Sequence, residues 1–260
     1  MPFHETDDGC RLAYEVAGLP DAPALVLSNS LGTSRTMWDW QMDRLADRFR
    51  VLRYDTRGHG ESDAPDATYT IDRLGRDALS LMDAVGITCA DVCGVSLGGM
   101  TALWLGVHAP ERVNRLVLAN TGARIGSNDM WNERIRGVTT EGLEVLADSI
   151  MARWLTAAFR AAEPQVVERL RTALCRTPVA GYVGCCAALR DADLRDAAAG
   201  VRAPCLVVTG VHDVATPPAL GTWLVEHLSG AAIVTLDAAH LSNIERAPQF
   251  NDAVTEFLSA

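Results

Sequence analysis

Residues 91–108 read Asp-Val-Cys-Gly-Val-Ser-Leu-Gly-Gly-Met-Thr-Ala-Leu-Trp-Leu-Gly-Val-His and predict a strand, a tight turn and a helix. The apolar run ends at Val95, a run of small and apolar residues begins at Leu97, and Ser96 lies between them with Gly94 and Gly98 two positions away. Glycines suit these positions because a serine in strained backbone geometry at a turn leaves no room for neighbouring side chains. We predict that Ser96 is a nucleophile; the alternative is a serine that only caps the helix.

A serine hydroxyl needs a neighbouring base to become nucleophilic, and the base needs an acid to hold its tautomer. When the serine lies in a strand-turn-helix setting, the acid and the histidine follow it in that order. Asp213 lies just beyond the apolar run Cys205–Thr209, and His240 lies just beyond Ile233–Asp237. We therefore expect Ser96, Asp213 and His240 to meet at one edge of the sheet.

Other histidines and acids compete for these roles. His59 follows a strand-like run but precedes Ser96, so we expect it to brace its own loop through hydrogen bonds, and His212 follows the wrong strand for the base. Asp55 and Asp237 remain alternatives for the acid. The other histidines lie at the N-terminus or at predicted helix ends, where a cation suits the helix dipole: His4, His108 and His227.

A tetrahedral intermediate also needs hydrogen-bond donors for its oxyanion. The Leu97 N–H, directly after the nucleophile at a helix N-terminus, is one expected donor. The second should come from an early loop, and Ser28-Asn29-Ser30-Leu31-Gly32-Thr33 follows a short strand. We assign the Leu31 N–H as that donor.

The rest of the chain alternates strand-like and helix-like segments, which indicates an α/β fold with a mostly parallel central sheet flanked by helices. The rhythm breaks between Thr121 and Arg195, where apolar residues recur only at helical spacing. We therefore predict a core of residues 1–120 and 196–260 with a helical cap of residues 121–195. The expected strands are 11–16, 24–28, 51–54, 91–95, 113–120, 204–209 and 233–237, and the expected helices are 42–49, 71–85, 97–108, 217–228 and 247–258.

Composition excludes several classes of function. The 260 residues carry a formal net charge of −10, which disfavours binding to nucleic acid, and no apolar run has the length of a membrane span. Acidic residues follow the first methionine, where a secretory signal would carry positive charge. The seven cysteines show no metal-ligand spacing. We expect a cytoplasmic protein without a metal; its oligomeric state cannot be deduced.

Taken together, these residues resemble the α/β-hydrolases over essentially the whole chain, including Asp55-Thr56-Arg57-Gly58-His59-Gly60-Glu61-Ser62. Within that superfamily the chain is similar to the 3-oxoadipate enol-lactonases. That similarity lies in three stretches: Asn29-Ser30-Leu31-Gly32, Asn120-Thr121-Gly122-Ala123-Arg124-Ile125-Gly126 and His240-Leu241-Ser242-Asn243-Ile244-Glu245. The resemblance implies hydrolysis of 3-oxoadipate enol-lactone to 3-oxoadipate in the bacterial β-ketoadipate pathway. It implies a small anionic lactone as the binding partner and no cofactor.

An anionic substrate requires a local cation in a protein of negative net charge. In the predicted cap, Trp131 and Arg134 are three residues apart and would share a helical face, and Trp154 could wall the pocket. Each could equally be an ordinary core tryptophan or solvated arginine. Two other functions remain open: another carboxylester, lactone or carbon–carbon bond hydrolase, and a small-molecule receptor. Haloalkane dehalogenation is disfavoured because Ser96 stands where those enzymes carry Asp.

Overall fold

The computed structural model describes residues 2–260 and has an eight-stranded sheet at its centre. The strand order is β1-β2-β4-β3-β5-β6-β7-β8; β3 to β8 run parallel, and β1 and β2 join antiparallel at one edge. This confirms the predicted fold class. The strands are β1 Phe3–Glu5, β2 Arg11–Gly18, β3 Ala24–Ser28, β4 Arg50–Tyr54, β5 Ala90–Val95, β6 Val113–Ala119, β7 Cys205–Gly210 and β8 Ala232–Leu236.

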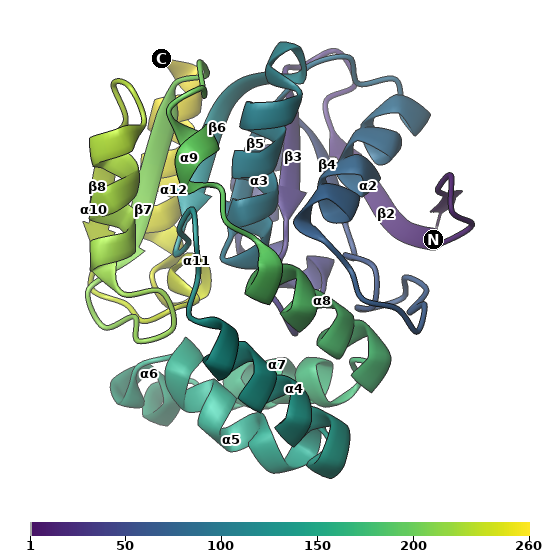
Figure 1. The fold of residues 1–260 in the computed structure, drawn as a ribbon. Coiled ribbons are helices and arrows are strands. Elements are labelled where there is room, and N and C mark those ends of the chain that lie inside the picture. Colours follow the sequence, from purple (N-terminus) through teal and green to yellow (C-terminus); the bar gives the residue numbers. More distant parts are fainter. Residues whose placement is uncertain (1) are drawn as a thin grey trace.

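Helices cover both faces of the sheet, with α2 and α3 on the near face and α12 on the far face in Figure 1. On the far face α1 packs against α12. The helices of this core are α1 Asp39–Ala46, α2 Ile71–Ala84, α3 Leu97–His108, α9 Arg195–Ala198, α10 Pro218–His227, α11 Ser242–Glu245 and α12 Ala247–Ser259, with short 3-10 turns at Arg35–Trp38 and Pro110–Arg112.

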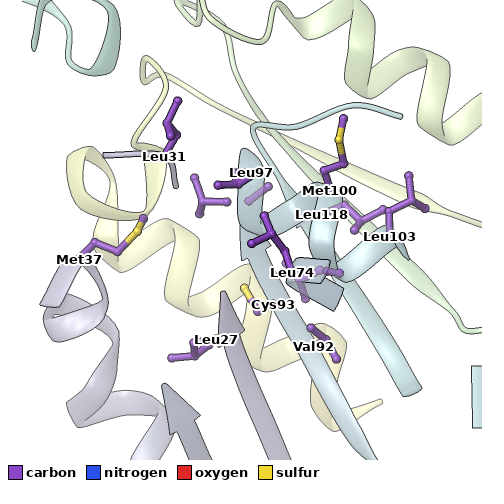
Figure 2. Packing of buried hydrophobic residues seen from close by; sticks show 14 of the residues in the cluster. Leu27, Leu31, Met37, Leu74, Val92, Cys93, Leu97, Met100, Leu103 and Leu118 are labelled. Carbon is purple, nitrogen blue, oxygen red and sulfur yellow. The ribbon is translucent and has the colours of Figure 1, made fainter. Parts of the chain in front are cut away.

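On the near face of the sheet, the core is formed by buried side chains of the central strands and of helices α2 and α3. Every residue of β5 and of β7 is buried, as expected for parallel strands covered on both sides. Figure 2 shows Leu27, Val92, Cys93 and Leu118 from neighbouring strands beside Leu74, Met100 and Leu103 of the helices. This packing fixes the carboxyl end of β5, where the nucleophile candidate lies.

Five helices between β6 and β7 form a separate layer at the carboxyl end of the sheet (Figure 1). They are α4 Asn128–Glu141, α5 Leu143–Trp154, α6 Ala157–Ala162, α7 Pro164–Cys175 and α8 Val179–Asp191. All five fall inside the segment 121–195, which we call the cap. Its standing as a separate domain stays a prediction.

One contact between α8 and the core brings two backbones together. A Cβ atom on Gly181 of α8 would lie 2.3 Å from the Gly58 Cα atom in the loop after β4, and a Cβ on Gly58 would lie 2.4 Å from the Gly181 Cα. Only glycine permits so close an approach. Nearby, the Tyr69 N–H donates to the Gly184 carbonyl over 3.3 Å, so α8 is held to the core at two points.

Most predicted elements agree with the structure within one to three residues. The helix expected over 42–49 lies at Asp39–Ala46 instead, and the chain leaves it before Phe49, whose N–H still donates to the Leu45 carbonyl over 2.8 Å. Phe49 lies outside the helix but is buried, so its apolar side chain extended the helical pattern of the sequence by three residues. Neither β1 nor α11 was predicted, because each is too short to show a periodic pattern.

Candidate active site

Ser96 lies at the turn between β5 and α3 in strained backbone geometry, with φ 57° and ψ −113°. Its N–H donates to the Ala119 carbonyl of β6 over 2.9 Å. A Cβ on Gly94 would lie 2.1 Å from the Gly98 carbonyl oxygen, and a Cβ on Gly98 would lie 2.0 Å from that of Ser28. Glycine is therefore required at both positions for the turn to close.

Asp213 and His240 lie together on the loops that follow β7 and β8. The His240 Nδ1 and Asp213 Oδ2 atoms are 2.8 Å apart, and both side chains are buried. The carboxylate has further donors: Oδ1 accepts from the N–H groups of Ala215 and Thr216 at 2.8 and 2.9 Å, and Oδ2 accepts from Thr216 Oγ1 at 2.6 Å. This arrangement fixes the direction of the carboxylate toward the histidine.

The same contacts decide the charge of Asp213. Burial by itself would raise the pKa of this carboxyl, but the charge and hydrogen bond of His240 and the hydrogen bonds from Thr216 outweigh it and hold the pKa at about 2. Asp213 is therefore ionised at neutral pH. An ionised acid at Nδ1 keeps the imidazole proton on that nitrogen and leaves Nε2 free to act as a base.

Ser96 and His240 both line one cavity beneath the cap, which also reaches Leu31 and Thr216. Within residues 2–260, no hydrogen bond joins Ser96 Oγ to the imidazole. Nucleophile and base are often loosely aligned until substrate binds. The structure thus brings all three predicted residues to one site, and their catalytic roles stay a proposal.

The loop that carries Leu31 is held by His59. The Gly32 N–H donates to His59 Nε2 over 2.9 Å, which leaves the ring proton on Nδ1, 3.2 Å from the Arg57 carbonyl. Burial lowers the pKa of His59 to about 4, so the ring is neutral at physiological pH. His59 therefore braces the loop instead of serving as the base, and Leu31 and Ser96 line the same cavity.

The remaining rivals have partners away from the site. His212 Nε2 is 2.9 Å from Asp237 Oδ1 at an exposed position, and Asp55 is paired with the buried Arg35. His4 contacts Ser80 Oγ at 2.6 Å. Of the two helix-end histidines, His227 stacks on Trp223, and the His108 ring lies tilted against Trp104.

All three predicted cap residues line the cavity, namely Trp131, Arg134 and Trp154. The Trp131 Nε1–H donates to the Ile125 carbonyl over 2.6 Å, so this indole offers the cavity its apolar ring. The structure adds Arg153 of α5, which the sequence analysis missed. The sequence signal for Arg153 was that it directly precedes Trp154, a predicted cavity residue, in the same helix. That signal is weak, because consecutive residues of a helix do not usually share a face.

Asn120 is a second polar residue of the site, and its role was not predicted from the sequence. It directly follows β6 and has φ 45°, a left-handed value unusual outside glycine. Its Nδ2 donates to Asp213 Oδ2 over 2.9 Å and to the Ala239 carbonyl over 3.2 Å, while its Oδ1 accepts from Ser242 Oγ over 2.5 Å. One side chain therefore links the acid to the loop that carries His240.

Glu245 of α11 connects that histidine loop to the cap. Its Oε2 accepts from the N–H of Ala239 at 3.0 Å and from that of Thr156 at 3.3 Å, and its Oε1 accepts from the Thr156 hydroxyl. Beside it, the Leu241 N–H donates to the Trp154 carbonyl over 2.9 Å. The residues on both sides of His240 are thus hydrogen-bonded, directly or through Glu245, to the cap.

Within residues 2–260, no cluster of three or more His, Cys, Asp or Glu side chains is arranged to hold a metal ion. None of the helices described has the length and apolar character needed to cross a membrane.

Residues 23–247 match the profile of the α/β-hydrolase fold family. The chain is 42% identical over 259 residues to 3-oxoadipate enol-lactonase 2 of Acinetobacter baylyi, covering 98% of this chain and 97% of that protein. It is 38% identical to 3-oxoadipate enol-lactonase 1 of the same organism, covering 97% and 94%. The crystal structure of the enol-lactonase from Burkholderia xenovorans LB400 superposes with a TM-score of 0.98 at 45% identity, covering 100% of both chains.

Proposed function

The chain belongs to the α/β-hydrolase fold family, among the relatives of the 3-oxoadipate enol-lactonases, and from this premise we propose that it opens 3-oxoadipate enol-lactone to 3-oxoadipate. It is a hydrolase that acts on a lactone ester. The observation that carries the proposal is the pairing of His240 with the ionised Asp213 on the cavity that Ser96 also lines.

In the proposed first step, Ser96 Oγ attacks the lactone carbonyl while His240 Nε2 accepts the hydroxyl proton. The negative charge on the carbonyl oxygen is stabilised by the N–H groups of Leu31 and Leu97. The ring C–O bond then breaks, the enolate oxygen takes the proton from His240, and the enol relaxes to a ketone. The ketone makes ring opening hard to reverse.

In the second step, water gives a proton to His240 and attacks the acyl-enzyme carbonyl. Collapse of this intermediate returns the proton to Ser96 and releases a new carboxylate. No step needs a metal or cofactor, since nucleophile, base and oxyanion donors suffice. Arg134 is proposed to hold the free carboxylate of the substrate, with the aromatic rings of Trp131 and Trp154 beside the acyl chain.

The test is a spectroscopic assay of 3-oxoadipate enol-lactone consumption by the purified protein, with Ser96→Ala as the inactive control. We expect the variant to lose at least about 10⁴-fold in kcat. Turnover of simple aryl esters without turnover of the enol-lactone would instead favour a different ester or carbon–carbon bond hydrolase.

The receptor alternative is tested with a serine-reactive phosphonate. Labelling of the wild type and not of Ser96→Ala supports catalysis, and labelling of neither favours a receptor. The proposed pathway role places the protein in the cytoplasm, which fractionation of the native cells would check.

A further inference from the structure

The cap side of the cavity carries two cations and no acid. Arg134 of α4 and Arg153 of α5 both line it, and no Asp or Glu lines it within residues 2–260. Five other arginines of the cap are paired with aspartates: Arg124 with Asp193, Arg169 with Asp39, Arg171 with Asp148, Arg190 with Asp191 and Arg195 with Asp193. Neither Arg134 nor Arg153 forms an ion pair with any residue in the described range 2–260.

The two guanidinium groups are close enough to influence each other. Burial, and then the charge of Arg134, lower the pKa of Arg153 below its ordinary value, and the smaller effects of Asp213 and Tyr182 oppose this. Tyr182 lines the same cavity as the two arginines. Two half-buried like charges without a counter-ion cost free energy in the folded protein. An anion bound between them would remove that cost.

The chemistry of the pair selects a carboxylate. A guanidinium presents donors in a planar fork that matches the two oxygens of a carboxylate. Arg153 lines the same cavity as Thr216 and His240, which places it on the side of the cap that faces the catalytic loops. A carboxylate held there would lie in the cavity that Ser96 lines, as the acyl part of a small acidic ester requires.

We propose that Arg153 is a second carboxylate-binding residue, which together with Arg134 holds the free carboxylate of the acyl chain and restricts the site to lactones and esters of dicarboxylic acids. The identity of the bound group rests on the proposed function. Each arginine then contributes specificity for an anionic over a neutral acyl chain, and the two act on one carboxylate.

Calorimetric titration with adipate tests this without any turnover, in a Ser96→Ala background. Adipate carries the same terminal carboxylate as the proposed product. We expect Arg153→Met to weaken adipate binding by about 10- to 100-fold, the loss typical of a charged hydrogen bond. Arg136→Met is the matched control, since Arg136 is exposed on α4 and does not line the cavity; it should leave binding unchanged. Equal affinity with and without Arg153, or no adipate binding at millimolar concentration, overturns the proposal.

Two further comparisons sharpen the result. If both arginines hold one carboxylate, the effects of Arg134→Met and Arg153→Met are not additive in the double variant, whereas additive effects contradict a shared site. Arg153→Lys keeps the charge and should retain part of the affinity even if the methionine variant folds poorly. Adipate binding through Arg153 in a protein that does not hydrolyse the enol-lactone would refute the proposed function and leave this inference intact.

Discussion

Asn120 Nδ2 donates a hydrogen bond to Asp213 Oδ2 over 2.9 Å, although the two residues are 93 positions apart in the chain. The amide is held by its other end, because Ser242 Oγ donates to Asn120 Oδ1. Asn120 is not among the residues that line the cavity, and it acts through the acid, so it is a positioning residue. The left-handed backbone at this position places the amide between the two loops.

Replacement of Asn120 by Ala should lower kcat by roughly 10-fold with little change in KM, because one donor to the buried Asp213 carboxylate is lost. Asn120→Asp should lower kcat further, since it places a second acid beside the first. Steady-state kinetics with the enol-lactone measure both. An unchanged kcat in Asn120→Ala, with the variant folded by circular dichroism, would remove Asn120 from the positioning role.

Acidification should destabilise the protein through His59 before it affects Asp213. The pKa of His59 is about 4 in the folded chain and about 6.5 when unfolded, so the unfolded state takes up the proton first and stability falls as the pH drops from 6.5 to 4. The full difference corresponds to ~3 kcal/mol. The stability from Asp213, whose pKa is lowered from 3.8 to about 2, is lost only between those two values. Urea unfolding between pH 7 and 4.5 checks the first window.

His59→Gln provides the control for that measurement. Glutamine can still accept a hydrogen bond from the Gly32 N–H, and it does not titrate. Its unfolding free energy should vary less between pH 7 and 4.5 than that of the wild type. A wild-type profile that is flat in this range would contradict the assignment of a neutral, buried His59.

Glu245→Gln should lower kcat by about 10-fold, because an amide can no longer accept hydrogen bonds at both of its polar atoms. One of the donors, which are the N–H groups of Ala239 and Thr156 and the Thr156 hydroxyl, then loses its acceptor, and the histidine loop loosens. Thr156→Val is the matched control, since it removes only the hydroxyl donor on the cap side. If Glu245→Gln lowers stability and leaves kcat unchanged, the carboxylate contributes to stability and has no role in positioning His240.

Gly98→Ala should reduce stability by more than ~3 kcal/mol or prevent folding, because its Cβ would lie 2.0 Å from the Ser28 carbonyl oxygen. Gly137→Ala is the opposite case. Gly137 lies inside α4 with ordinary helical φ, and a Cβ there meets nothing closer than 3.8 Å, so alanine should stabilise by about 0.5–1 kcal/mol. Thermal unfolding of both variants tests the contrast.

The sequence allowed the sheet and the order of Ser96, Asp213 and His240 to be predicted because each depends on a local pattern. A buried strand reads as an apolar run, and the turn at Ser96 demands glycines at fixed spacing. The roles of these three residues stay predictions until a variant is assayed.

Arg153, Asn120 and Thr216 could not be predicted in the same way. Their importance comes from residues that reach them only after folding. Arg153 lies in one cavity with Arg134. Asn120 and Thr216 donate to the buried Asp213 carboxylate, and Thr216 also contacts His240. No spacing within one element encodes such a neighbour. On the cap side of the cavity, Arg134 and Trp131 could be predicted as a pair because they are three apart on one helix.

The mutual contact of Gly58 and Gly181 ties α8 to the core. α8 cannot leave the sheet without parting those backbones, and α4 packs along α8. α5 is tied to the core elsewhere, because the Trp154 carbonyl accepts from the Leu241 N–H, and α5 packs on both α7 and α4. Arg134 and Arg153 therefore lie on helices that are each held to the sheet, directly or through α8, so the separation of their guanidinium groups is set before any anion enters.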